Sequence, residues 1–224
     1  MGTQVDVVRV FTDAAGQFGN ELGVARASEI AENARQHTAE QLGFSETVFV
    51  ADAVDGVARV RIYTPTIELP FAGHPTVGTA WWLAEQGQVV HTLEVPAGPV
   101  AAQFTDGLTW VRARAEWAPR FTFAEVGAAE EVLALRSEDY SEGQHYVWCW
   151  VDESRGEIRS RMFAPGLGIA EDQATGAAAV AITALLRRGL KITQGTGSQL
   201  FTEWDSDGWV RLGGRVVPAA PVEV

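Results

Sequence analysis

The segment RIYTP at residues 61–65 recurs later in the chain as RMFAP at residues 161–165. In both copies a strand-like run ends in an aromatic residue, and a proline follows two positions later. Each copy precedes a turn rich in small residues, GHPTVGTA at residues 73–80 and DQATGAAA at residues 172–179. The same order of motifs in both parts predicts an internal structural repeat, in which each copy forms one half of the molecule.

The loop between strand and turn carries carboxylates in both copies. Glu68 occupies it in the first copy, and Glu171 and Asp172 occupy it in the second. Each turn then continues into an apolar helix. We predict that these helices end at Gly87 and Gly189, because glycine is common at the position just after a helix end. The repeated unit is therefore strand, proline, acidic loop, small-residue turn and helix.

The remaining segments are predicted to be mostly strands. Alternating and β-branched runs predict strands at residues 4–12, 47–51, 58–63, 92–95, 100–104, 108–114, 145–152, 157–163, 199–204 and 209–212. Helices are predicted at residues 29–41, 76–86 and 175–188. Ser28 can cap the first of these helices, and residues 121–139 are predicted to form an irregular connection with a short helix.

The helix at residues 175–188 is so poor in charge that we expect protein to surround it. The expected fold is α+β, with two pseudo-symmetric halves, residues 1–116 and residues 117–224. Each half is a mainly antiparallel sheet or barrel wrapped around a central helix. Unpaired N–H groups at two facing helix N-termini would bind a carboxylate, so the expected ligand is a small anionic metabolite.

Bulk properties exclude several classes of partner. The 224 residues carry a formal net charge of -12, and an acidic surface repels nucleic-acid phosphates and anionic lipids, so we expect neither nucleic acid nor membrane as a partner. No apolar run approaches the roughly 20 residues that span a bilayer. The first residues do not resemble a signal peptide, and a cytoplasmic location is the expectation.

Two residues at the helix-preceding turns are candidates for acid–base chemistry. His74 can exchange a proton near neutral pH, although a capping or structural histidine is an equal alternative. Asp172 occupies the comparable place in the second half, where it could instead be a helix N-cap. Both alternatives remain open, because a cap residue also stands at the mouth of the helix.

Two further polar residues lie at the ends of predicted strands. Glu46 enters the apolar run VFV at residues 48–50, where partial desolvation would raise its pKa and suit it to proton transfer. A solvated loop glutamate is the simpler interpretation from spacing alone. Asn20 follows the first strand, either in a plain turn or as a hydrogen-bonding residue for a substrate.

Other site classes find no support in the sequence. His37, His74, His91 and His145 are scattered without the spacing of metal ligands, so no metal site is expected. The sequence contains no GxSxG elbow, P-loop or dinucleotide fingerprint.

The motifs resemble the phenazine-biosynthesis isomerase (PhzF-like) family. They are GN at residues 19–20, SETVFV at residues 45–50, ELPFAGHPTVGTA at residues 68–80, FAPGLGIAEDQATGAAA at residues 163–179 and TQG at residues 193–195. They occur in the expected order over most of the chain, and the GHPT and ED-x-ATG segments are the specific ones. The resemblance implies the diaminopimelate epimerase fold, with a site between two similar halves.

The resemblance also implies residue roles. Glu46 matches the catalytic glutamate that moves a proton between substrate carbons, assisted by His74 and Asp172, without metal or organic cofactor. The implied substrate-binding residues are Asn20, Ser45, Gly73, Thr175, Gly176 and Ala177. The resemblance further implies a homodimer.

Several departures from the family pattern leave the substrate open. Glu21 and Gln173 stand where the family often has proline, Ala177 replaces a serine, and the second half looks shortened. Related epimerases use two facing thiols, which a chain whose single cysteine is Cys149 cannot supply.

We therefore expect a cofactor-independent isomerase acting on a small carboxylate-bearing metabolite, in a biosynthetic pathway. One alternative is the same scaffold redirected to a cyclisation or a C–C bond step. The other is a non-catalytic small-molecule binder, favoured if Glu46, His74 and Asp172 lay more than about 10 Å apart.

Overall fold

The computed structural model describes residues 3–224, apart from the side chain of Leu167. Strands and helices alternate irregularly along the chain. The strands are β1 (Gln4–Thr12), β2 (Asn20–Arg26), β3 (Glu46–Val50), β4 (Val57–Tyr63), β5 (Glu68–Leu69), β6 (Thr92–Val95), β7 (Gly98–Thr105), β8 (Leu108–Arg114), β9 (Thr122–Glu125), β10 (His145–Asp152), β11 (Glu157–Ala164), β12 (Ile169–Asp172), β13 (Leu190–Gln194), β14 (Ser198–Trp204) and β15 (Trp209–Glu223). The α-helices are α1 (Arg35–Leu42), α2 (Gly73–Glu85), α3 (Ala129–Ala134) and α4 (Gly176–Leu186). Among the described residues, every helix is too short or too polar to cross a membrane.

The first half is a closed barrel around α2. Its strands follow the order β1-β2-β3-β4-β6-β7-β8-β15, and β15 pairs back onto β1 to complete the ring. Ten residues of α2 are buried, and the helix packs against β1, β8 and β15 among other strands. A helix that is apolar on nearly every side needs such an enclosure, because no face of it can be left to water.

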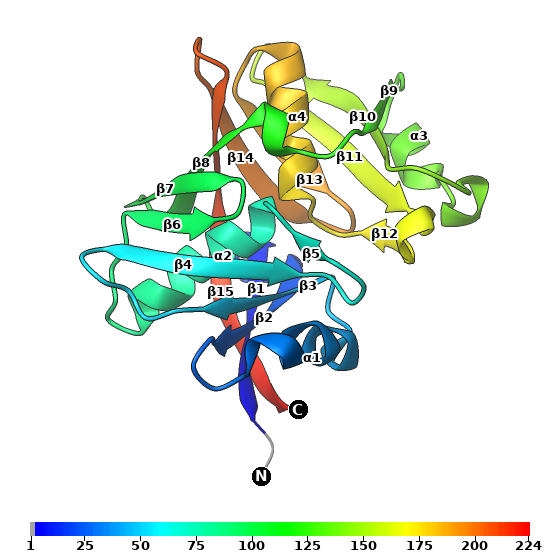
Figure 1. The fold of residues 1–224 in the computed structure, drawn as a ribbon. Helices are drawn as coiled ribbons and strands as arrows, with labels where there is room; N and C mark the ends of the chain where they lie inside the picture. Colours follow the sequence, from blue (N-terminus) through cyan, green and yellow to red (C-terminus); the bar gives the residue numbers. More distant parts are fainter. Residues whose placement is uncertain (1–2) are drawn as a thin grey trace.

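The second half is an open sheet that covers α4. Its strands follow the order β15-β14-β13-β11-β10-β9, so β15 belongs to both halves. α4 lies against β14 and β15, and its first five residues are buried. Figure 1 shows α2 in the lower half and α4 in the upper half, each next to its own strands. The predicted fold class, α+β with two halves that each wrap a helix, is confirmed.

The sequence repeat is a structural repeat. Arg61 on β4 pairs with Glu68 on β5, and Arg161 on β11 pairs with Glu171 on β12, each through two guanidinium nitrogens. In both halves the short antiparallel strand after the proline is therefore held to the preceding strand by one arginine–carboxylate pair, and it leads directly into the central helix.

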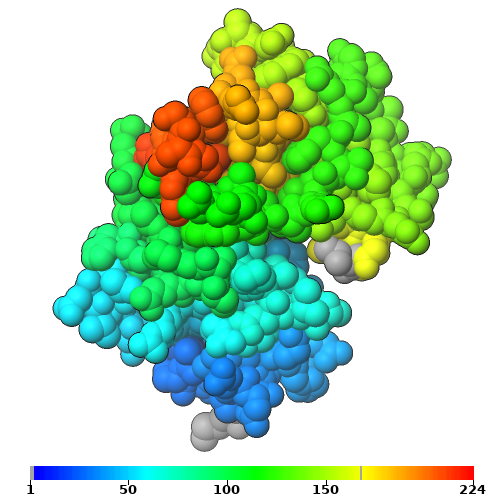
Figure 2. Space-filling view, turned by 45° about the horizontal axis from the view of Figure 1, so that its top comes forward, coloured from blue at the N-terminus to red at the C-terminus, as the bar shows by residue number. Residues whose placement is uncertain are grey.

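The last strand crosses from one half to the other. Its first residues pair with β8 and β14, while Arg215 to Glu223 run antiparallel to β1. Thr3 and Val224 consequently pair with each other at one end of the molecule, and Figure 2 shows the halves as two lobes. Residues near the C-terminus complete the first barrel, whereas the division into residues 1–116 and 117–224 remains a prediction.

The helix boundaries differ from the sequence predictions. A 3-10 turn at Glu32–Ala34 precedes α1, so Ser28 does not cap it. Residues 27–29 instead form a turn whose backbone N–H groups bond to Val50 and Arg26. α2 begins at Gly73, three residues earlier than predicted, because Pro75 is tolerated in the first turn of a helix, where its missing N–H is not needed.

Several strands of the structure were not predicted from the sequence. β2, β5, β9, β12 and β13 were not predicted, and β15 extends well beyond residue 212. The carboxylates of the two predicted acidic loops, Glu68, Glu171 and Asp172, therefore lie on the short strands β5 and β12. Pro218 and Pro221 argue against a strand locally, yet Pro218 pairs opposite Val8 because β1 offers an unpaired edge there. The short helix predicted within residues 121–139 is present as α3.

The N-termini of the two central helices touch each other. A Cβ atom on Gly73 would lie 2.7 Å from the carbonyl carbon of Gly176, and a Cβ on Gly176 would lie 2.8 Å from the backbone N of His74. Both approaches are closer than a side chain allows, so only glycine fits at these two positions.

We expect Gly176→Ala to destabilise the protein by about 2 kcal/mol or more, because the added methyl group meets backbone atoms that cannot move aside. Urea unfolding measures the change. Gly166→Ala is the matched control, since the nearest atom to its Cβ would lie 3.6 Å away, an ordinary contact distance, and we expect a change within about 0.5 kcal/mol. Equal stabilities of the two variants would contradict the close helix contact.

Candidate active site

The meeting point of α2 and α4 lies between the two halves. The first N–H groups of a helix have no partner within the helix, and they carry partial positive charge. Gly73 and His74 open α2, and Gly176 and Ala177 open α4. Because the two first turns are in contact, unpaired N–H groups from both halves converge on one region.

Glu46 and His74 form a buried pair at this junction. Glu46 is the first residue of β3, and its Oε2 atom lies 3.3 Å from Nδ1 of His74. The His74 side chain is 3% exposed and that of Glu46 is 17% exposed. The two residues that sequence analysis selected from different motifs are therefore direct neighbours, and the alternative of a solvated loop glutamate does not hold.

Burial shifts the pKa values of Glu46 and His74 in opposite directions. Desolvation raises the pKa of Glu46 to about 7, partly offset by a hydrogen bond with Ser45. Desolvation lowers the pKa of His74 to about 4, against the opposing influence of the Asp172 charge. At neutral pH the imidazole is thus neutral, while the carboxyl group can both take up and release a proton.

Asp172 connects the two halves. Its Oδ1 accepts a 2.6 Å hydrogen bond from Nδ2 of Asn20 in the first half, and its Oδ2 accepts one of 2.7 Å from Oγ1 of Thr175. Burial, and then the nearby charge of Glu46, raise the pKa of Asp172. The three candidate acid–base groups are therefore close enough to influence one another's ionisation.

Asn20 and Ser45 link Asp172 to the residue before Glu46. Ser45 Oγ lies 3.5 Å from Asn20 Oδ1, which places the Asn20 amide between the serine and Asp172. In the structure Asn20 thus has protein partners on both ends of its amide. Its predicted contact with a substrate remains a prediction.

Gln194 is a site residue that sequence analysis missed. Its side chain is fully buried, and its Nε2 donates both to the backbone oxygen of Asp172 and to Oγ1 of Thr175, each at 2.8 Å. The TQG motif at residues 193–195 was noticed in the sequence, but nothing local indicated that the glutamine reaches the entry of α4.

Two expectations for the helix starts need correction. Thr175, not Asp172, is the N-cap position of α4, and the N-cap position of α2 is Ala72, so neither Asp172 nor His74 caps a helix. The backbone N–H of Thr175 already donates to Gln194 Oε1 at 3.2 Å. Among the backbone N–H groups predicted to bind a carboxylate, that of Thr175 thus has a protein partner, and binding by Gly73, Thr175, Gly176 and Ala177 remains a prediction.

Several buried side-chain polar atoms lack a hydrogen-bond partner, and two of them belong to the site. Among the described residues, Glu46 Oε2 and His74 Nε2 are both enclosed without a hydrogen bond. Leaving such atoms unsatisfied is costly, and orphaned polar atoms of this kind occur where a protein receives a ligand. In the part of the chain that the structure describes, no group of three His, Cys, Asp or Glu side chains is arranged to hold a metal ion.

An open cavity of about 410 Å³ adjoins the site at Asn20 and Ser45. Arg9, Phe18 and Phe44 supply one cationic and two aromatic side chains to its lining. Arg9 is partly balanced by Glu21, whose carboxylate lies 3.9 Å from the guanidinium group.

A closed barrel and a second wrapped helix, with buried acid–base groups where they meet, define an epimerase-like fold. Solved structures share it across the whole chain. A PhzF-family protein of Enterococcus faecalis superposes with a TM-score of 0.80 at 21% identity, covering 100% of this chain and 99% of the other. A hydroxyproline epimerase of Agrobacterium vitis superposes with a TM-score of 0.64 at 14% identity, covering 99% of this chain and 92% of the other.

The chain belongs to the phenazine biosynthesis-like protein family, whose sequence model matches residues 8–146 and 138–210. A trans-2,3-dihydro-3-hydroxyanthranilate isomerase of Pseudomonas aeruginosa is 33% identical over 200 aligned positions, covering 71% of each chain. An isomerase of unassigned activity from Pasteurella multocida is 28% identical over 251 positions, covering 89% of this chain and 86% of the other. The relatives are named isomerases and the fold is shared, so the predicted family and enzyme class are confirmed.

We expect the replacement of Glu46 by glutamine to increase the free energy of unfolding by an amount that depends on pH. The carboxyl group has a pKa near 4.5 in an unfolded chain and about 7 in the folded protein, so its ionisation costs folding free energy as pH rises through this window. The lowered pKa of His74 acts in the opposite direction, but His74 is present in both proteins. We expect the free energy of unfolding of Glu46→Gln, relative to wild type, to increase between pH 4.5 and 7 by on the order of 1–3 kcal/mol.

Urea unfolding at a series of pH values measures this difference. Glu94→Gln is the matched control, because it makes the same substitution at an exposed carboxylate on β6. A Glu46→Gln difference that varies with pH no more than that of the control would contradict the burial of an ionisable carboxyl group at this position.

Proposed function

We propose that this protein is a cofactor-independent isomerase that moves a proton, and with it a double bond, within a small carboxylate-bearing metabolite of a biosynthetic pathway. The observation that carries the proposal is the enclosed Glu46–His74 pair, with one unpartnered atom on each residue and a carboxyl group that ionises near neutrality. Such a group matches the requirement for a general base and acid at physiological pH.

The residues support a balanced proton-transfer sequence. Ionised Glu46 takes a proton from a substrate carbon, and the electron pair of that C–H bond becomes part of a new double bond. The electron pair of the original double bond moves to its far carbon, and that carbon accepts a proton from the now protonated Glu46. Neutral His74 can hold or pass this proton, and Asp172 orients the groups, so protein and solvent end as they began.

The substrate carboxylate would lie against the backbone N–H groups of Gly73, Gly176 and Ala177. Two converging helix N-termini favour an anion there without any arginine. The placement keeps the reacting carbons near Glu46, since His74 follows Gly73 directly along α2.

The substrate named for the Pseudomonas relatives, trans-2,3-dihydro-3-hydroxyanthranilate, is the first compound to test. Glu46 and His74 lie 3.3 Å apart and both influence the ionisation of Asp172. That proximity favours catalysis over a non-catalytic binder. The same scaffold redirected to a cyclisation or a C–C bond step is the alternative if this compound is not turned over.

Glu46→Gln should lower turnover of trans-2,3-dihydro-3-hydroxyanthranilate by about 10²- to 10⁴-fold, because a glutamine cannot accept the proton. The reaction is followed in D₂O by NMR, which reports both isomerisation and deuterium incorporation at carbon. Glu94→Gln should turn over as fast as wild type. Undiminished turnover and exchange in Glu46→Gln would remove Glu46 from the proposed mechanism.

The pH dependence of the rate is a second test of Glu46 as the base. Because the base must be ionised, kcat/KM should rise as pH increases through about 7, the pKa that burial gives Glu46. Steady-state kinetics from pH 5 to pH 9 measure the profile. A rate already at its plateau at pH 5 would contradict a base with a raised pKa.

A further inference from the structure

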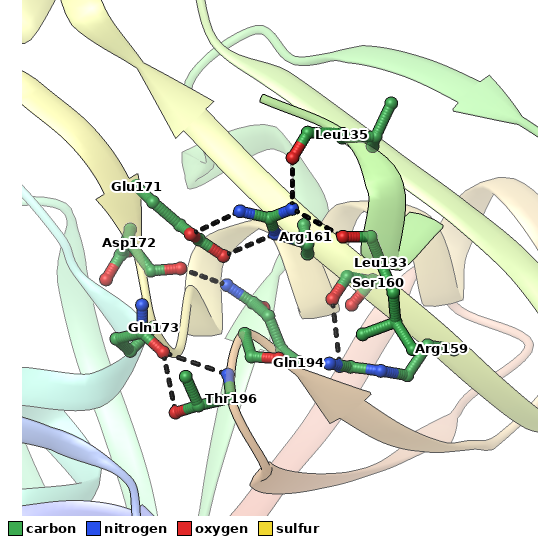
Figure 3. Close-up of polar contacts among 11 residues, drawn as sticks. Leu133, Leu135, Arg159, Ser160, Arg161, Glu171, Asp172, Gln173, Gln194 and Thr196 are labelled. Carbon is green, nitrogen blue, oxygen red and sulfur yellow. Dashed lines mark hydrogen bonds and ion pairs between the residues drawn. The ribbon is translucent and has the colours of Figure 1, made fainter. Parts of the chain in front are cut away.

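Three consecutive residues before α4 are each held by a different element. The carboxylate of Glu171 accepts from Nε and Nη2 of Arg161 at 2.8 and 2.7 Å. The backbone oxygen of Asp172 accepts from Gln194 Nε2, and the side-chain Oε1 of Gln173 accepts from both the backbone N–H and the hydroxyl of Thr196, each at 2.9 Å. Figure 3 shows these contacts surrounding the segment that carries Asp172.

The Gln173 contact reaches the turn that joins β13 to β14. Gly195 in this turn has a positive φ of 58°, and a Cβ there would lie 2.5 Å from Gln173 Oε1. A side chain at position 195 would therefore displace the glutamine amide. Arg159 holds the turn in place, because its buried guanidinium donates hydrogen bonds to the backbone oxygens of Thr193 and Gly195.

The same turn also contacts the first half of the molecule. The backbone N–H of Gly19 donates to Ser198 Oγ at 3.0 Å, and the ring of Phe18 lies over Gly197, where a Cβ would come within 2.7 Å of it. Gly19 directly precedes Asn20. The β13–β14 turn is thus bound on one side to the neighbour of Asn20 and on the other to the neighbour of Asp172.

Asn20 and Asp172, which are adjacent to these two anchored residues, form the short hydrogen bond that joins the halves, from Asn20 Nδ2 to Asp172 Oδ1. We propose that Gln173 is a positioning residue. By accepting hydrogen bonds from Thr196, it anchors the segment between β12 and α4 and so fixes the carboxylate of the adjacent Asp172 at the site. Two hydrogen bonds to Gln173 Oε1, from the N–H and the hydroxyl of Thr196, supply this restraint.

The proposal rests on the proposed function for its catalytic consequence, but its structural part stands on the contacts alone. Gln173→Met keeps the length of the side chain and removes the acceptor oxygen. Gln173→Glu keeps an acceptor oxygen at the same reach. Gln103→Met is the matched control, because Gln103 is an exposed glutamine whose Oε1 accepts from Arg211 on the outer surface of the sheet.

In steady-state assays with trans-2,3-dihydro-3-hydroxyanthranilate, Gln173→Met should lose roughly 10- to 100-fold in kcat, since a small misplacement of a catalytic group is enough for such a loss. Its KM should stay near the wild-type value, because the backbone groups proposed to bind the carboxylate belong to other residues. Gln173→Glu should recover most of the loss, and Gln103→Met should match wild type.

An unchanged kcat in Gln173→Met, a loss confined to KM, or an equal loss in Gln173→Glu would each overturn the proposal. Hydrogen exchange provides a second measurement that needs no substrate. Because the Thr196 N–H donates to Gln173 Oε1, exchange at this amide should be about tenfold faster in Gln173→Met and near wild type in Gln173→Glu.

The two measurements separate the possible failures. If wild type does not turn over the compound, the proposed function fails for this substrate, and the exchange rates alone decide whether Gln173 anchors the loop. Equal exchange at Thr196 in wild type and Gln173→Met overturns the anchoring even where the enzyme is active.

Discussion

Gly73 and Gly176 bring the first turns of α2 and α4 into van der Waals contact, with no room for a side chain between them. The candidate site depends on this contact, because it places the unpaired N–H groups of two helices, and His74 beside them, in one region. Each helix must in turn be enclosed by strands, since both are apolar on nearly every side. The closed barrel and the open sheet thus hold the helices in the position that the glycines require.

Burial at this junction changes the pKa values of the acid–base groups. Glu46 and Asp172 are carboxyl groups in an environment that disfavours charge, so burial raises their pKa values. His74 is an imidazole in the same environment, and burial lowers its pKa to about 4, below the value of about 7 for Glu46. The polar groups around Asp172 from Asn20, Thr175 and Gln194 fix its orientation, whereas the inner atoms of Glu46 and His74 stay unpartnered. Both carboxylate oxygens of Asp172 therefore accept hydrogen bonds from the protein, whereas Glu46 and His74 each keep one buried polar atom without a hydrogen bond.

Sequence patterns were most reliable where a local rule and the tertiary structure agree. The repeat at residues 61–65 and 161–165 predicted two equivalent units, and each unit contains the same arginine–carboxylate pair. Patterns failed where long-range pairing decided the outcome. β2 and β13 carry glycine or polar residues that weaken their local signal, and the end of β15 contains prolines, yet all three segments are strands because neighbouring edges accept them.

The sequence by itself determined the fold class, the family and the identity of Glu46, His74 and Asp172 as candidates, because motifs and apolar periodicity are properties of short segments. Only the tertiary structure decided that Glu46 and His74 are 3.3 Å apart, that Gln194 reaches the start of α4, and that Gln173 binds a turn shared with the first half. Each of these contacts joins segments far apart in the chain. Their distances follow from how strands pair and helices pack, which no local pattern encodes.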